Sequence, residues 1–229
     1  MVAKRKKQDI MNIAIIQADI KDKDIEKNLL YYNKVLEDLE KDVDLVILPE
    51  MFLTGFTADT SLAKQSKEKG LSFMKNIARN KDIAIEGSLL VEEENHYYNR
   101  HYFIHKNNIS YYDKRHLFSM SKEKEYLTCG KEKTIVSYNG FKILLMTCYD
   151  LRFPIWSMNN LDNNSFLYDI IVYVASWPKS RKSQWKKLLM ARAIENQSFV
   201  IGVNRKGKDI NNISYSGDSC VINPKGIVL

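Results

Sequence analysis

The chain has 229 residues, of which 45% are hydrophobic and 28% are charged, and its net charge is +7 at pH 7. This composition is typical of a globular protein with ample material for a core. The longest apolar runs, such as residues 170–175, are far too short to cross a bilayer, so the sequence predicts no membrane partner.

The positive charge does not mark a nucleic-acid-binding protein. The lysines are scattered and often lie next to acids, as in Lys21-Asp22-Lys23-Asp24, and no strand interleaves basic with aromatic residues. We therefore expect no nucleic acid partner, and only a mild attraction for acidic small molecules.

The cysteines and the N-terminus indicate a cytoplasmic protein. Cys129, Cys148 and Cys220 are an odd, sparse set without a CxxC pair, which argues against a disulfide framework and a zinc knuckle. The basic residues 4–7 are not followed by the apolar run of a signal peptide. Residues 1–10 are expected to be a flexible lead, unless Met11 is a second start site.

The first ninety residues alternate between buried strands and amphipathic helices. Strands are expected at 12–18, 44–50 and 82–91, and helices at 24–41 and at 61–80, the latter broken by Gly70. Continuous apolar strands separated by helices predict a sheet of parallel character with both faces buried.

The middle of the chain is rich in strands, and helices return after it. Strands are expected at 97–106, 109–113, 134–138 and 141–147, and Asn139-Gly140 is a hairpin signal. The remaining predicted elements are a short helix at 154–161, a strand at 169–175, a helix at 183–196, a strand at 199–204, and final strands at 214–222 and from 227 onward. No linker, repeat or low-complexity tract interrupts them, so we expect one mixed α/β domain over residues 1–229, with helices outside and sheet inside.

Cys148 follows the apolar run Ile143-Leu144-Leu145-Met146, and Pro154 is well placed to open a helix soon afterwards. The thiol is therefore expected at the carboxyl end of a strand, where open α/β sheets bind ligands. The positive end of the next helix would lower its pKa. The alternative is that Cys148 is a small core residue.

Two other residues complete a possible catalytic set. Glu50 ends a buried strand, and Lys114 follows a strand-like segment, although each taken alone fits a solvated surface position. A buried cysteine needs a base, and acyl chemistry needs a donor for the oxyanion. Glu50, Lys114 and Cys148 supply both without a histidine; a Cys–His enzyme would instead have to use His116.

Metal and nucleotide sites have no support in the sequence. His101 and His105 on one strand would lie about 13 Å apart, too far to share an ion. Neither GxGxxG nor GxxxxGK[ST] occurs. We expect no metal and no cofactor.

Three motifs in order resemble those of the nitrilase, or carbon–nitrogen hydrolase, superfamily. They are Leu48-Pro49-Glu50-Met51-Phe52, Tyr112-Asp113-Lys114-Arg115-His116-Leu117-Phe118 and Thr147-Cys148-Tyr149-Asp150-Leu151-Arg152-Phe153-Pro154. The resemblance covers most of the chain. It implies an αββα sandwich of two mixed sheets between helices, a Glu50–Lys114–Cys148 triad, and a second glutamate, which is Glu123 or, failing that, Glu125.

A finer resemblance is to the omega-amidases, which deaminate the 2-oxo acids derived from glutamine and asparagine. Segments that carry it include Ala175-Ser176-Trp177-Pro178 and residues 191–197. It implies an amidase that releases ammonia from a small amide through a thioester on Cys148. The other interpretations are a carbon–nitrogen hydrolase for an aliphatic or N-carbamoyl substrate, and a non-catalytic binding protein of the same fold.

The resemblance also implies roles for residues around the triad. Lys114 and the backbone N–H of Tyr149 would hold the oxyanion. Arg152 would hold the far carboxylate of the substrate, or else form a structural salt bridge, and Trp177 would wall the pocket or belong to the core. A homodimer is implied as well, and the family's C-terminal strand and tail are expected to be absent after Leu229.

Overall fold

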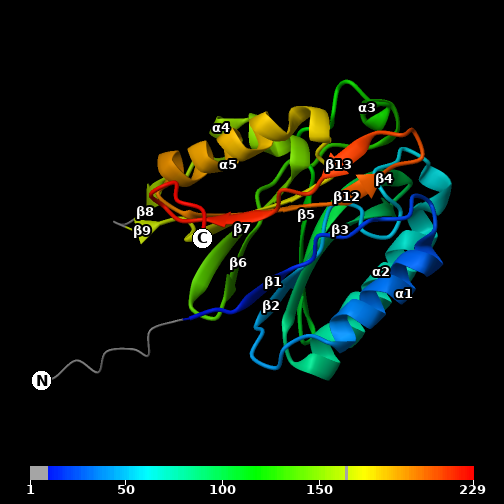
Figure 1. Ribbon diagram of the computed structural model, residues 1–229, viewed down its shortest axis with the longest axis horizontal. Coiled ribbons are helices and arrows are strands. Elements are labelled where there is room, and N and C mark those ends of the chain that lie inside the picture. The colour runs from blue at the N-terminus through cyan, green and yellow to red at the C-terminus, as the bar shows by residue number, and fades with distance from the viewer. Residues whose placement is uncertain (1–9, 163–164) are drawn as a thin grey trace, which may run out of the picture.

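Two five-stranded sheets pack face to face in the computed structural model, which describes residues 10–162 and 165–229 (Figure 1). Helices cover the outer face of each sheet, which confirms the predicted αββα sandwich. The flexible lead expected at residues 1–10 lies, apart from Ile10, outside the described residues. No helix in the described part of the chain is long and apolar enough to cross a membrane.

The first sheet contains the N-terminal strands in sequence order. Its first three strands run parallel, and the last two join by antiparallel pairing. The strands are β1 (Ile13–Ile15), β2 (Leu45–Ile47), β3 (Ala84–Glu93), β4 (His96–His105) and β5 (Asn108–Asp113).

Two long helices, α1 (Ile25–Glu37) and α2 (Ala63–Lys81), cover this sheet. The 3₁₀ turn η1 (Thr60–Leu62) comes directly before α2 in the chain. The side chain of Asp24 caps α1 by accepting a hydrogen bond from the backbone N–H of Lys27. The predicted break at Gly70 is wrong, because α2 continues through it. A Cβ at Gly70 would lie 2.5 Å from a methyl group of Leu89, so this glycine lets α2 approach β3 closely.

The second sheet is built from the C-terminal half and has a parallel centre with antiparallel edges. The edge hairpin turns at Asn139 and Gly140, both with positive φ, as predicted. In spatial order its strands are β14 (Cys220–Ile222), β11 (Phe199–Asn204), β10 (Ile170–Ala175), β7 (Phe141–Thr147) and β6 (Ile135–Tyr138).

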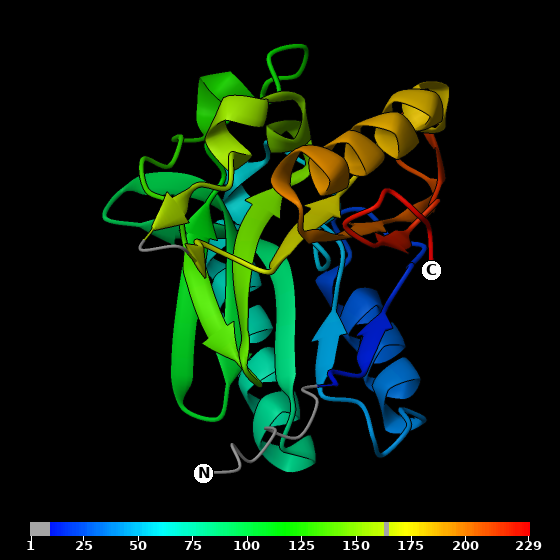
Figure 2. The ribbon, with the colours of Figure 1, turned by 90° about the vertical axis from the view of Figure 1, so that its left-hand side faces the viewer.

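Helix α5 (Lys182–Asn196) lies over the outer face of the second sheet, opposite α1 and α2 (Figure 2). The remaining elements are short. They are α3 (Glu123–Tyr126), α4 (Pro154–Ser157), the 3₁₀ turns η2 (Cys148–Arg152) and η3 (Lys179–Arg181), and the two-stranded pairs β8 (Leu161–Asp162) with β9 (Ser165–Phe166) and β12 (Lys206–Lys208) with β13 (Ser214–Ser216).

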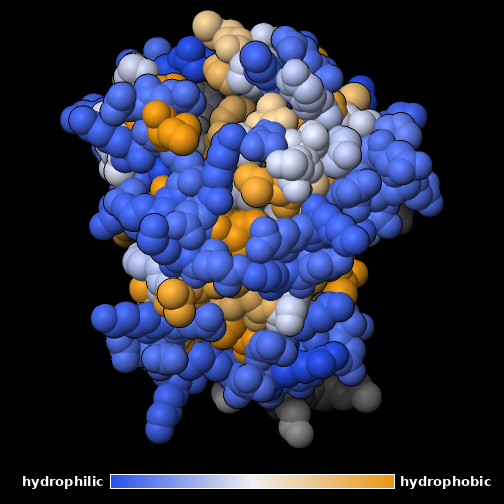
Figure 3. All heavy atoms as spheres, turned by 90° about the vertical axis from the view of Figure 1, so that its right-hand side faces the viewer, coloured by the Kyte–Doolittle hydropathy of each residue, from blue (hydrophilic) through white to orange (hydrophobic). Residues whose placement is uncertain are grey.

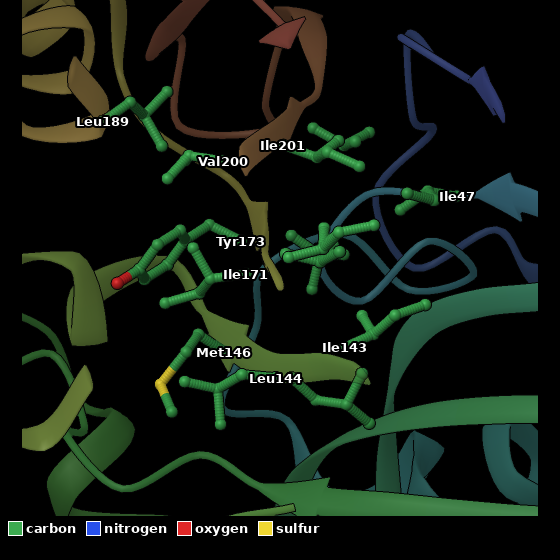
Figure 4. Packing of buried hydrophobic residues seen from close by; sticks show 14 of the residues in the cluster. Ile47, Ile143, Leu144, Met146, Ile171, Tyr173, Leu189, Val200 and Ile201 are labelled. Atoms are coloured by element: carbon green, nitrogen blue, oxygen red, sulfur yellow. The ribbon is translucent and has the colours of Figure 1, made fainter. Parts of the chain in front are cut away.

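Alternation along the strands separates two apolar layers. Leu45 and Ile47 of β2 face the second sheet, whereas Val46 and Leu48 pack beneath α1 and α2. Figure 4 shows Ile47 on the same side of the second sheet as Ile143 and Ile201, whereas Leu144, Ile171 and Val200 point to the other side, where Leu189 of α5 lies.

Several predicted boundaries near the C-terminus are wrong. The helix expected at 154–161 ends at Ser157, and residues 161–162 are extended. The strand expected at 214–222 is two strands, β13 and β14, that belong to different sheets. A left-handed residue, Asp218, lies between them and redirects the chain. From residue 227 onward only an isolated bridge forms, between Val228 and Ile222.

Candidate active site

Glu50 lies in the turn directly after β2, and its side chain is fully buried. One carboxylate oxygen, Oε1, accepts hydrogen bonds from Lys114 Nζ at 2.9 Å and Asn99 Nδ2 at 2.8 Å. The other, Oε2, accepts from the backbone N–H of Ser176 at 2.8 Å. Both oxygens are thus held in place, which fixes the direction in which the carboxylate points.

Lys114 follows β5 directly and is also buried. Its Nζ lies 2.9 Å from Oε1 of Glu50 and 2.9 Å from Oε1 of Glu123. Burial alone would lower the pKa of Lys114, but the carboxylates of Glu123 and Glu50 outweigh it and raise that pKa well above its ordinary value. The ammonium group is therefore charged throughout the physiological range.

Glu123 begins the short helix α3 and is 1% exposed, whereas Glu125 is exposed to solvent. Its Oε2 accepts hydrogen bonds from Lys114 Nζ at 3.0 Å and from the backbone N–H of Phe118 at 2.6 Å. Burial and the charge of Glu50 raise the pKa of Glu123, although Lys114 opposes this. Of the two glutamates left open by the sequence, the structure brings Glu123 into the cluster.

Cys148 begins η2 immediately after β7 and has a φ of +44°. A non-glycine residue in this region costs about 1–3 kcal/mol, a strain that is typical of functional sites. The lowered thiol pKa expected from the sequence is wrong, because burial and the charge of Glu50 raise the pKa of Cys148 well above its ordinary value. The helix at Pro154 begins too far along the chain to offset them. At rest the thiol is protonated and needs a base.

Two contributors to this cluster were missed by the sequence analysis. Asn99 in β4 donates from Nδ2 to Glu50 and, at 3.3 Å, to Glu123, and its Oδ1 accepts from the hydroxyl of Ser88. Ser176 donates its backbone N–H to the carboxylate of Glu50 and its hydroxyl to the backbone carbonyl of Glu50 at 3.4 Å. A buried asparagine in a strand was a signal that this part of the sheet lines a polar site, but a backbone donor leaves no trace in the sequence.

Asp150 joins the segment that carries Lys114 to the one that carries Cys148. Its buried carboxylate accepts hydrogen bonds from the hydroxyl of Tyr112 at 2.8 Å, from the backbone N–H of Thr147 at 3.0 Å and from the backbone N–H of His116 at 2.9 Å. The ring Nδ1 of His116 lies 2.7 Å from the same carboxylate. Asp150 therefore fixes the distance between the two segments, and His116 is engaged with it rather than with the thiol.

A cavity of about 710 Å³ opens above Cys148. Its wall contains Lys114 and Glu123 as well as Tyr149, Arg152 and Trp177, the residues expected to bind the oxyanion and the substrate. Residues of α3 and β13 line the cavity, and on their side of the molecule hydrophobic side chains lie between hydrophilic ones (Figure 3). It therefore has the size and the mixed lining of a small-molecule site.

Arg152 and Trp177 occupy different environments within this wall. Arg152 is exposed, its guanidinium lies 5.1 Å from the centre of the Trp177 ring, and no carboxylate among the described residues forms a salt bridge with it. Trp177 is 4% exposed and also packs against Trp185, with ring centroids 5.5 Å apart. It thus belongs to both the cavity wall and the core.

The described residues bring no three potential ligands together in a metal-binding arrangement. His101 instead pairs with buried Glu86 across β3 and β4, with its Nε2 3.1 Å from Oε1 of Glu86. The chemistry available in the cavity is that of a thiol, a carboxylate with fixed orientation and a permanently charged ammonium group. Such a set can form and hydrolyse an acyl-thioester.

Comparison with known proteins agrees with this chemistry. The family model described as carbon-nitrogen hydrolase matches residues 12–229. The chain is 38% identical over 220 residues to omega-amidase YafV of Escherichia coli, and the match covers 96% of this chain and 84% of that protein. It is 33% identical over 222 residues to 2-oxoglutaramate amidase of Bacillus subtilis, with coverage of 95% and 84%.

A solved structure has the same fold at similar sequence identity. It is that of a CN-hydrolase superfamily protein from Xanthomonas campestris with an arsenic adduct in its active site. The two chains are 37% identical and superimpose with a TM-score of 0.92, over 95% of this chain and 84% of the other.

Proposed function

Because the chain belongs to the carbon–nitrogen hydrolase family, it is a hydrolase of carbon–nitrogen bonds other than peptide bonds, and we propose that it is an omega-amidase. The substrate is a small acid with a terminal carboxamide, such as 2-oxoglutaramate or 2-oxosuccinamate, and the products are the carboxylate and ammonia. The observation that carries the proposal is the buried Glu50–Lys114–Glu123 cluster beside a thiol that opens into a cavity.

In the proposed first step, Glu50 removes the proton from Cys148, and the sulfur attacks the amide carbon. The raised pKa of the thiol supports this need for a base, because the thiolate is scarce at neutral pH. The protonated Glu50 then delivers its proton to the departing ammonia. One carboxylate acts first as base and then as acid, as in other two-step covalent mechanisms.

The oxyanion is held by Lys114 and the backbone N–H of Tyr149 in this proposal. Lys114 Nζ donates to Glu50 and to both carboxylate oxygens of Glu123, and it also lines the cavity, so a substrate oxygen can replace one of the two Glu123 contacts. Removal of one oxyanion donor typically costs about 10²–10³-fold in rate. Lys114 is therefore both the cation that opposes the burial-raised pKa of Glu123 and an electrophilic catalyst.

Water hydrolyses the thioester in the second step. Glu50, ionised again after ammonia departs, takes a proton from that water, and Glu123 orients the water or the substrate through its link to Lys114. Glu123 is well suited to this positioning role because its carboxylate is fixed by Lys114 and by the backbone N–H of Phe118. No metal or cofactor is part of the proposed reaction.

The other end of the substrate meets Arg152 and Trp177. Arg152 offers a guanidinium without a carboxylate partner among the described residues, and Trp177 supplies an apolar wall. A planar guanidinium binds a carboxylate with two parallel hydrogen bonds, which gives direction as well as affinity.

The test is ammonia release from 2-oxoglutaramate, 2-oxosuccinamate, glutamine and a plain aliphatic amide, with wild type beside Cys148→Ala. The proposal predicts release that depends on Cys148 and favours the two oxo-acid amides. Release only from the other amides would keep the hydrolase and reject the omega-amidase. A folded Cys148→Ala variant with undiminished turnover would reject the mechanism.

Homodimerisation and a cytoplasmic location are parts of the same proposal. Met190 and Ile194 expose apolar side chains on α5, as expected of a helix that a second subunit covers. Sedimentation velocity at micromolar concentration tests the dimer: a dimeric mass supports it and a monomeric mass rejects it.

A further inference from the structure

Two arginines of the cavity wall, Arg152 and Arg181, differ from the other arginines of the described residues. Among the described residues, the guanidinium of Arg152 forms no hydrogen bond, and that of Arg181 donates only to the thioether sulfur of Met120, at 3.6 Å. All the others donate to at least one oxygen: Arg79, Arg100, Arg115, Arg192 and Arg205. A guanidinium has five N–H donors, so two groups at the cavity hold most of their donors free.

Trp177 contacts both arginines, Arg152 at its guanidinium and Arg181 at its backbone carbonyl. The guanidinium of Arg152 lies over the Trp177 ring, 5.1 Å from the ring centroid. The indole N–H of Trp177 donates to the backbone carbonyl of Arg181 at 2.8 Å. Trp177 is itself fixed, because Asn204 accepts from its backbone N–H and donates to its carbonyl. The two arginines are therefore attached to a single rigid platform.

Arg181 has a second support that connects it to the catalytic cluster. Its guanidinium lies 5.2 Å from the centre of the Phe118 ring, and the backbone N–H of Phe118 donates to Glu123. Stacking on an aromatic ring restrains a guanidinium while leaving its N–H edge available. Arg181 is half-buried whereas Arg152 is exposed, so the charge of Arg181 is less screened by water.

The acids of the cavity wall do not neutralise these two cations. Asp22 is engaged by Arg205 and the backbone N–H of Ile210, and Asp59 by Lys23. Asp209 accepts from the hydroxyl of Tyr215 and from backbone N–H groups of its own loop. Each wall carboxylate thus has partners already, and the wall presents the unmatched charges of Arg152, Arg181 and the exposed Lys122 to whatever enters.

We propose that Arg181, with Arg152 beside it on Trp177, forms a two-guanidinium receptor for the carboxylate at the end of the substrate remote from the scissile amide. Arg181 is the principal specificity determinant, since it is the more buried of the two. The receptor rests on the proposed amidase function and adds Arg181 as the residue that selects amides with a carboxylate at the opposite end. Neutral amides of the same length bind in the cavity without using the two-guanidinium receptor.

The experiment compares kcat/KM for 2-oxoglutaramate and for pentanamide, which has the same five carbons without the carboxylate. In Arg181→Met we expect a loss of about 10- to 100-fold for 2-oxoglutaramate, mostly through KM, and less than about 3-fold for pentanamide, since charged hydrogen bonds contribute at this scale. Arg181→Lys retains the charge but not the fork and is expected to fall between wild type and Arg181→Met.

Lys179→Met is the matched control. Lys179 lies two residues before Arg181 and carries the same charge, but its exposed side chain does not line the cavity. It should leave both substrates within about 3-fold of wild type. Inhibition by the product 2-oxoglutarate gives a second measurement that needs no turnover of a weak substrate: its inhibition constant should rise in Arg181→Met in step with KM.

Equal losses for the two amides in Arg181→Met, or an equal loss in Lys179→Met, would overturn the receptor. So would an unchanged inhibition constant for 2-oxoglutarate. If Arg181→Met does not fold, the same comparison is made in Arg181→Lys. The receptor predicts that this variant, too, loses kcat/KM for 2-oxoglutaramate but not for pentanamide. Wild type without preference for 2-oxoglutaramate would instead reject the omega-amidase function, so the two failures are distinguishable.

Discussion

Two clusters of ionisable side chains are buried where the sheets meet, and only one of them reaches the cavity. Glu50 and Lys114 follow the carboxyl ends of β2 and β5, Glu123 begins α3, and hydrogen bonds satisfy both glutamates. Glu86 and His101 lie deeper, between the sheets. His101 Nδ1 lies 3.1 Å from the carbonyl of Met146, but no well-directed hydrogen bond reaches either carboxylate oxygen of Glu86 within the described residues.

The difference between the two clusters shows that burial alone raises a pKa but does not make a catalytic site. Burial is the largest cause of a raised pKa in both Glu86 and Glu123. Only the cluster of Glu50, Lys114 and Glu123 adds a thiol and an opening to the substrate. A perturbed pKa is therefore no sufficient sign of catalysis, and geometry relative to the cavity separates the two clusters.

Carboxyl-to-amide replacement tests the comparison most strongly. Glu50→Gln preserves shape but removes the base, and we expect kcat for 2-oxoglutaramate to fall by about 10³-fold or more. The same change in Glu86→Gln should leave kcat within about 3-fold. Steady-state ammonia release measures both, and circular dichroism checks folding. Comparable losses in the two variants would abolish the distinction between the clusters.

Asp150 is expected to give an intermediate effect. It lies outside the reacting groups but fixes the Lys114 segment to the Cys148 turn through four contacts. Asp150→Asn should lower kcat by about 10- to 100-fold and also destabilise the fold by about 2–4 kcal/mol, because buried donors lose an ionised acceptor.

The matched control for Asp150→Asn is Asp169→Asn. Asp169 accepts from the backbone N–H of Lys142 at 2.8 Å near the start of β7, away from the cavity wall. It should leave kcat nearly unchanged. Urea titration and turnover of the same preparations separate the two effects, and a loss of stability in Asp150→Asn without loss of kcat would remove its positioning role.

The reactivity of the thiol sharpens the role of Glu50. Glu50 raises the pKa of Cys148, so its neutralisation lowers that pKa and increases the thiolate fraction at a given pH. Glu50→Gln should react with iodoacetamide at pH 8 about 3- to 10-fold faster than wild type while turning over far more slowly. The measurement belongs in a Cys129→Ser background, because Cys129 is exposed. Slower alkylation would contradict the inferred contact between Glu50 and the thiol.

The smallest expected effect is on stability at Glu86. Its pKa is raised in the folded protein, so the folded state binds that proton more tightly than the unfolded state. The stability that protonated Glu86 adds to the folded state is fully present below the ordinary pKa of a glutamate. It is lost as pH rises through the raised pKa of Glu86. Relative to wild type, Glu86→Gln should gain stability between pH 4 and pH 8, by less than about 2 kcal/mol. Exposed Glu68→Gln should show no such trend.

The sequence predicted the layers, and it singled out residues that the structure brings together at the cavity, because both depend on local patterns. Apolar runs identified the buried strands, and the strand ends at Glu50 and Cys148 placed these residues at one edge. Helix ends were predicted less well: α1 ends at Glu37 rather than at 41, since Leu39 is only half-buried. Gly70 was misread because its close neighbour, Leu89, is distant in sequence.

The features that escaped prediction depend on contacts between distant segments. Asn99, the backbone N–H of Ser176 and the direction of the thiol pKa all depend on how the two sheets are brought together. Arg181 likewise looks like one of many surface cations until Trp177 and Phe118 are folded beside it. Such roles follow from three-dimensional proximity and have no local signature.

The most direct test of the catalytic account is intact-protein mass spectrometry after rapid mixing with 2-oxoglutaramate, in wild type, Glu123→Gln and Cys148→Ala. The account predicts a covalent adduct equal to the substrate minus ammonia, located on Cys148, accumulating in Glu123→Gln and absent from Cys148→Ala. Hydrolysis by Cys148→Ala at the wild-type rate, or an adduct on another residue, would contradict it.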